Sequence, residues 1–179
     1  MFKVKFSNGR EEAFETLENA NLKGANLEGA NLEGANLAGA DLEGAILDGS
    51  NLEGANLERS NLKFAYAGSA NLKGANLKFS NLNYTRLEES DLRGATLDGA
   101  DLFNTAFCNA ELTGIDLRRV NLGSADFRWA NLTDAQLNKT SENADLEGAI
   151  LSGCSMNENL DPDEESDVEV DDFDLFLNA

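Results

Sequence analysis

Residues 26–45 read NLEGANLEGANLAGADLEGA and repeat a five-residue unit, with Leu at the centre of each unit and Ala two places before it. A period of five suits neither regular element. On an α-helix it would spread the leucines around the surface, and on a strand it would place successive leucines on opposite faces. The pattern makes sense if the chain bends by about a right angle in every unit, so that four units close one turn with every Leu inward. Stacked turns then satisfy each other's backbone groups at a spacing of about 4.8 Å.

The same register extends from Leu22 to Leu137, which makes 24 units. Leu fills 21 of the centres, and the position two places before the centre is Ala in 16 units. One large and one small inward residue per side suits a narrow core. Asn or Asp before the centre and Gly two places after it suit tight bends. We therefore expect an all-β solenoid. The three centres without Leu are Ala67, which should leave a gap or a local adjustment around Tyr66, and Phe107 and Phe127, which should pack in the core.

The recurring A-(N/D)-L-x-G units, over roughly residues 15–156, resemble the pentapeptide-repeat family. The resemblance implies a right-handed quadrilateral β-helix, and six turns at strand spacing imply a rod about 30 Å long. Similar proteins are abundant in cyanobacteria, where some are linked to cell differentiation. Other members resemble duplex DNA and bind DNA gyrase. The near-consensus units of this chain look more like the cyanobacterial group.

Both ends depart from the repeat. Residues 1–14 alternate apolar positions and then give an Asn-Gly turn signal, so we expect a strand or hairpin that caps the first turn. The repeat domain should span 15–156. Its register breaks after Leu137 and resumes at Leu146, which we interpret as a four-residue insertion at one corner, a loop near 138–143. Residues 157–179 hold ten acidic and no basic residues and end in an apolar cluster, so this tail is disordered, a cap that folds back, or a segment that docks on a partner.

Charge and composition exclude several functions. The net charge is −19, and −9 remains without the tail, so a basic nucleic-acid-binding protein is excluded. The chain has no His, and its two cysteines, Cys108 and Cys154, fit neither a zinc pattern nor a disulfide, so we expect two thiols. We expect no catalytic site, no cofactor and no metal site. The sequence shows neither a leader nor a membrane-spanning run, so we expect a cytoplasmic protein without membrane association.

The residues that break the repeat are the candidates for function. Outward aromatic residues are the least expected, because other units carry Gly, Lys or Glu at these places. They either stack on neighbouring turns or form a partner-binding patch. Arg118, Arg119 and Arg128 with Trp129 form a basic-aromatic cluster that we interpret as a local ion-pairing surface. The candidate partner-binding residues are Phe64, Tyr66, Phe79, Tyr84, Phe103 and Trp129.

These observations favour a non-enzymatic protein–protein interaction module, and a regulatory module is one form of it. The sequence does not identify the partner. Two alternatives stay open at this point. The acidic rod could act as a DNA mimic that binds an enzyme such as DNA gyrase, or it could be a structural spacer or a homodimer that forms through its cap.

Overall fold

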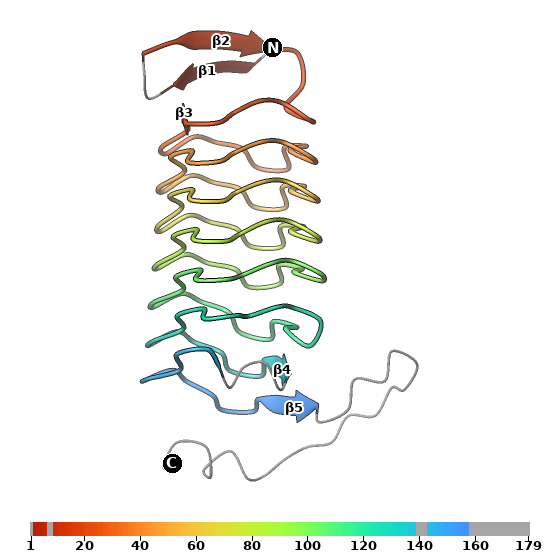
Figure 1. Cartoon of the computed structure of the whole chain (residues 1–179), viewed down its shortest axis with the longest axis vertical. Coiled ribbons are helices and arrows are strands. Elements are labelled where there is room, and N and C mark those ends of the chain that lie inside the picture. The colour runs from red at the N-terminus through yellow and green to blue at the C-terminus, as the bar shows by residue number, and fades with distance from the viewer. Residues whose placement is uncertain (1, 7–8, 139–142, 158–179) are drawn as a thin grey trace.

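The computed structural model describes residues 2–6, 9–138 and 143–157. In this part of the chain the backbone winds into a column of stacked coils without α-helices (Figure 1). Single-residue parallel bridges join positions twenty apart, such as Asn21 with Asp41 and Asn61 with Asn81. The Leu22 N–H donates to the Asp41 carbonyl at 2.8 Å, which is a normal ladder hydrogen bond. One coil therefore holds twenty residues, or four of the five-residue units.

Each unit ends in a tight turn, which is why the bridges stay one residue long. In the first full unit the Ala25 N–H donates to the Leu22 carbonyl at 2.9 Å, and Gly24 has a φ of +66°. A positive φ at the third residue of a turn is typical of type II and favours Gly. The Asn21 side chain supports the turn, because its Oδ1 accepts a hydrogen bond from the Lys23 N–H at 3.2 Å.

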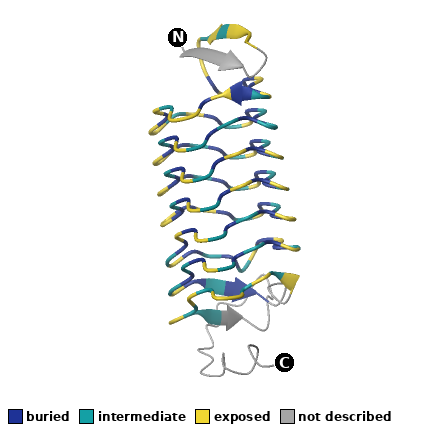
Figure 2. Cartoon of the chain, turned by 90° about the vertical axis from the view of Figure 1, so that its left-hand side faces the viewer, coloured by how far each residue is buried: buried dark blue, intermediate teal, exposed yellow. Residues whose placement is uncertain are grey.

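The core runs along the axis of the column and contains the residues that the five-residue pattern places inward (Figure 2). All 24 unit centres from Leu22 to Leu137 are buried, and Ala67 is among them. The Phe107 and Phe127 rings stack in parallel with their centroids 4.8 Å apart. The predicted core positions are therefore confirmed for the two phenylalanines as well as for the leucines.

A short antiparallel sheet covers the N-terminal end of the column. It is formed by β1 (Phe2–Phe6), β2 (Glu11–Phe14) and β3 (Ala25–Asn26), in the order β2-β1-β3. Because β1 pairs with β3 of the first coil, the hairpin occupies backbone groups that would otherwise form an open edge.

The last coil is one residue shorter than the others. Asp126 pairs with Asp145, and the parallel pair of β4 (Gln136–Asn138) and β5 (Ser155–Asn157) has the same offset of nineteen. The four-residue insertion expected after Leu137 is therefore wrong: Leu146 belongs to the column of Phe127, two units beyond Leu137, and one residue is missing from the coil.

Within the predicted loop, residues 139–142 lie outside the described residues, as does the predicted tail after residue 157. None of the described segments forms a helix long and apolar enough to span a membrane.

Candidate interaction surface

Three of the six candidate aromatics come together on consecutive coils. The Phe64 and Tyr84 rings stack with their centroids 5.1 Å apart, and Tyr84 meets Phe103 edge-to-face at 5.6 Å. We call these three residues the aromatic ladder. The side chains nevertheless stay 46%, 41% and 42% exposed, so stacking covers only part of each ring. The ladder leaves a continuous apolar strip on the outside of the column.

Four of the six aromatics occupy the turn position that favours Gly. Phe64, Phe79, Tyr84 and Trp129 have φ values of 57–60°. The left-handed conformation costs an L-residue roughly 1–2 kcal/mol, and for a bulky side chain it is an outlier. Other units carry Gly at this position. An aromatic residue in place of Gly was therefore the sequence signal for a strained backbone at these four residues.

Phe79, Phe103 and Trp129 each lie over a glycine of the next coil. A Cβ added to Gly99 would come 2.6 Å from the Phe79 ring, and one added to Gly123 would come 2.8 Å from Phe103. Trp129 blocks Gly148 in the same way. We call these three glycines the platform glycines, because each gives an outward ring a flat backbone surface to rest on.

Cations lie over four of the six rings. Lys63 Nζ is 5.0 Å from the Phe64 centroid, which is within the usual range for a cation–π contact. The corresponding distances are 5.3 Å for Arg59 over Phe79, 5.6 Å for Arg86 over Tyr66 and 5.5 Å for Arg128 over Trp129. The exposed rings therefore already attract guanidinium and ammonium groups within the chain.

A shallow hollow of about 480 Å³ is lined by Tyr66, which lies two residues after Phe64 of the aromatic ladder, and we call it the Tyr66 depression. Gly68, which has no side chain and follows Ala67, is one of its lining residues. The Gly68 N–H donates to Asp48 Oδ1 at 2.8 Å, and the left-handed turn residue is here Ser69, with a φ of +54°. Ala67 itself is buried, and whether its neighbours fill the place of the missing Leu stays a prediction. The hollow is lined by Glu28, Asp48, Gly49, Tyr66, Gly68, Ser69, Arg86, Glu88 and Glu89.

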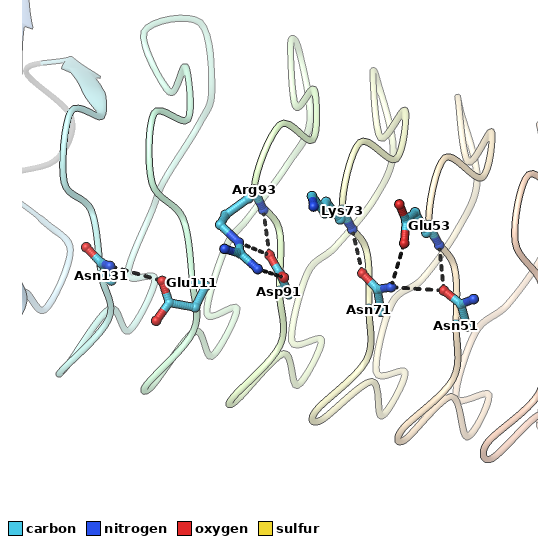
Figure 3. A network of polar contacts seen from close by, with 8 residues as sticks. All are labelled: Asn51, Glu53, Asn71, Lys73, Asp91, Arg93, Glu111 and Asn131. Atoms are coloured by element: carbon cyan, nitrogen blue, oxygen red, sulfur yellow. Dashed lines mark hydrogen bonds and ion pairs between the residues drawn. The ribbon is translucent and has the colours of Figure 1, made fainter.

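In the next column of units, polar side chains bond both within a coil and between neighbouring coils (Figure 3). Asn71 Nδ2 donates to Asn51 Oδ1 at 3.0 Å and to Glu53 Oε2 at 3.1 Å. Arg93 donates two hydrogen bonds to the Asp91 carboxylate, at 2.9 and 2.6 Å, and thereby lowers the pKa of Asp91. Most of the polar groups of this column are therefore hydrogen-bonded within the chain.

The ion pairing expected of the arginine cluster is confirmed for Arg118 and Arg128. Arg118 pairs with Asp116 at 2.9 Å, and Arg128 pairs with Asp126 at 2.7 Å. The Arg128 hydrogen bond lowers the pKa of Asp126 to about 2. Arg118 and Arg128 therefore form local ion pairs, as expected.

Cys108 and Cys154 are both free thiols, and burial raises the pKa of each. Cys154 Sγ donates to the Leu132 carbonyl at 2.9 Å. Within the described ranges, no three His, Cys, Asp or Glu side chains are grouped so that they could hold a metal ion. One exposed apolar residue was missed: Ile150 stands 53% exposed in a slot that other units mostly fill with Asn or Asp.

The repeat geometry and its turns agree with the comparison against known families. A family model described as pentapeptide repeats matches residues 17–54, 35–67, 70–107 and 110–141. The chain belongs to the pentapeptide-repeat family. Proteins of this family fold as right-handed β-helices and are generally non-enzymatic structural or interaction modules.

Solved pentapeptide-repeat structures are similar to the chain. HetL from the cyanobacterium Nostoc sp. strain PCC 7120, involved in heterocyst differentiation regulation, is 33% identical over 76% of this chain and 64% of its own, with a TM-score of 0.42. This pentapeptide-repeat chain thus spans less than two thirds of HetL. Rfr23 from the cyanobacterium Cyanothece 51142 is 25% identical over 75% of this chain and 85% of its own, with a TM-score of 0.46. QnrB1, a plasmid-mediated fluoroquinolone resistance protein, is 21% identical over 79% of this chain and 86% of its own, with a TM-score of 0.29. The comparison with curated proteins gives no match.

Proposed function

We propose that this pentapeptide-repeat protein is a non-enzymatic protein-interaction module and that its partner docks on the aromatic ladder. The observation that carries the proposal is the exposure of three contacting rings, two of which hold an unfavourable backbone conformation. Exposed aromatic clusters are typical of protein interfaces. Family membership supports an interaction role in general, and the ladder is the feature specific to this chain.

We infer that the scaffold beneath the ladder is a right-handed quadrilateral β-helix with one five-residue unit per face. The bridges between residues twenty apart and the turn in every unit support four faces per coil. In such a rod, residues twenty apart lie on one face, and a partner would meet the three rings of the ladder together.

Affinity capture from an extract of the organism that encodes the chain tests the proposal. The test variant is Phe64→Gly, Tyr84→Gly and Phe103→Asn, which replaces each ring by a residue that occupies the same slot elsewhere in its column. The matched control, Arg59→Gly, Asp134→Gly and Thr113→Asn, changes the same kinds of slot in other columns. We expect the bound partner to disappear with the test variant and to persist with the control. An unchanged partner set with both variants would return the ladder to a packing role.

Local ion pairs weaken the alternative that the rod mimics duplex DNA. Lys23 pairs with Glu43 and Lys78 with Asp98, both at 2.8 Å, so acidic charge is interrupted along the column. We expect no effect of micromolar protein in a DNA gyrase supercoiling assay. Sedimentation of the full chain and of a variant without residues 157–179 addresses the spacer and dimer alternatives, because a dimer lost with the tail would give that segment an assembly role.

A further inference from the structure

The charge beside the aromatic ladder distinguishes between kinds of partner. Tyr66, 44% exposed, lies two residues after Phe64 and carries the exposed apolar surface into the Tyr66 depression. One cation, Arg86, lines this hollow together with four carboxylates, which are those of Glu28, Asp48, Glu88 and Glu89. The docking surface is therefore a row of aromatic rings with a negatively charged hollow at its side.

Arg86 shows which chemical group the hollow accepts. Its guanidinium lies over the Tyr66 ring at 5.6 Å while Nε donates to Glu88 Oε1 at 3.1 Å. A planar guanidinium suits a ring face and a carboxylate together, which is why Arg is favoured at such places. Within the described part of the chain, Glu28, Asp48 and Glu89 form no ion pair, so three further carboxylates remain for a second cation.

Building on the proposed function, we propose that the partner presents a basic segment, with an arginine or lysine side chain in the Tyr66 depression and a neighbouring apolar side chain on Phe64 and Tyr84. A cation there would meet the carboxylates that carry no ion pair, and apolar contact with the ladder would supply burial. The carboxylates of the hollow favour a positively charged partner segment, and the exposed rings of the ladder determine where it docks.

The same charge disfavours two other occupants. Residues 157–179 of the chain carry ten acidic and no basic residues, and a second copy would bring a net charge of −19. Like charges brought together at an interface oppose association. The chain's own acidic segment and a second copy are thus poorer fits than a basic segment of another protein.

A titration of the ¹⁵N-labelled full-length protein with short peptides tests this inference. The probes are acetylated, amidated Gly-Arg-Phe-Arg-Gly and its counterpart Gly-Glu-Phe-Glu-Gly. We expect the Gly68 and Ser69 amide signals to shift with the Arg peptide and to stay unchanged with the Glu peptide. Asp48→Asn with Glu89→Gln should weaken binding by about tenfold, the effect of two exposed ion pairs. Glu33→Gln with Glu111→Gln makes the same charge change on the next column and should have little effect.

The outcomes separate this inference from the proposed function. Equal weakening by both carboxylate variants, equal binding of the two peptides, or no shift at Gly68 with millimolar Arg peptide would each overturn the basic-partner inference. None of these results touches the capture experiment, which depends on the rings of the aromatic ladder alone. Retained capture by the ladder variant would instead overturn the proposed function, whatever the peptides do.

Discussion

At the scale of the residue, the outward rings of this protein combine an unfavourable backbone with a favourable support. Phe79 and Trp129 hold a positive φ, and each ring rests on a platform glycine of the next coil. The contact with backbone recovers burial that an isolated surface ring would lack, at about 25 cal/mol per Å² of apolar area. The support explains how large apolar side chains persist at turn positions that suit Gly.

Substitution of a platform glycine should cost more than substitution of a glycine with open space. Gly54 and Gly123 both have positive φ, but only at Gly123 would a new Cβ meet another residue, at 2.8 Å from the Phe103 ring and 3.1 Å from its Cα. We expect Gly54→Ala to destabilise by about 1 kcal/mol and Gly123→Ala by about 2 kcal/mol or more. Urea unfolding of both variants measures the difference, and equal costs would contradict the role of the platform.

Buried hydroxyls inside the column should contribute measurably to stability. Thr85 is buried, and its hydroxyl donates to the Leu62 carbonyl at 2.7 Å. Thr85→Val keeps the shape but removes the hydrogen bond, so we expect a loss of about 1 kcal/mol in the free energy of unfolding. Thr113→Val, on the outside of the column, should stay within about 0.5 kcal/mol of the parent. Thermal or urea unfolding compares the two.

Stability should depend on the ionisation of Asp126 in acid. Its pKa is lowered from 3.8 to about 2 by the Arg128 hydrogen bond. A carboxyl with a depressed pKa contributes stability above the unfolded-state value, and this contribution is lost as the pH falls from about 4 toward 2. We expect Asp126→Asn to be less stable than the parent at pH 5 and to show a flatter decline between pH 4 and 2. Urea midpoints across this range test it, with Thr113→Val as the control that changes no ionisable group and should decline like the parent.

At the scale of the element, the β1–β2 hairpin is the piece that does not repeat. It pairs with Ala25 and Asn26 on the side of the first coil that has no preceding coil. Stacked repeats contact only their neighbours, so an end effect stays local. The hairpin therefore protects the first coil and has little influence on the aromatic ladder further along.

Removal of residues 1–14 should loosen the first coil alone. We expect faster amide hydrogen exchange over residues 17–36, because the edge of that coil loses its antiparallel partner. Exchange over residues 81–120 should stay unchanged. Peptide-resolved exchange with mass spectrometry measures both regions, and uniform acceleration along the chain would show instead that the hairpin supports the whole column.

At the scale of the whole molecule, the coil of twenty residues is the unit that keeps both the inward pattern and the columns in register. Deletion of residues 41–60 removes one whole coil and brings the coil before it onto the coil after it. The turn residues of the preceding coil have no side chains that could clash with the new neighbour, since they are Gly24, Gly29, Gly34 and Gly39. We expect this variant to keep its far-UV circular dichroism and its cooperative unfolding in a rod shorter by about 4.8 Å. Deletion of residues 41–58 puts leucines out of register and should abolish cooperative unfolding.

The period of five was enough to predict the buried residues, because only one kind of winding puts every fifth Leu inside. The outward aromatics were also visible as breaks in the repeat. The nineteen-residue coil was not, since the spacing of nine from Leu137 to Leu146 fits either an added loop or a shortened pair of units. Pairs at an offset of nineteen, such as Asp126 with Asp145, separate the two. The Tyr66 depression could not be predicted either, because it depends on the orientations of the Asp48 and Arg86 side chains, which the repeat pattern does not determine.

The relation between an outward ring and the glycine twenty residues further on makes the rod a molecular ruler. Phe79 with Gly99 and Phe103 with Gly123 obey it, and Gly54 and Gly74 offer vacant landing places of the same kind. An aromatic residue introduced twenty positions before such a glycine would place one exposed ring on a chosen coil, and successive coils lie about 4.8 Å apart. The rod can therefore serve as a scaffold on which exposed aromatic side chains are introduced at chosen positions along its axis.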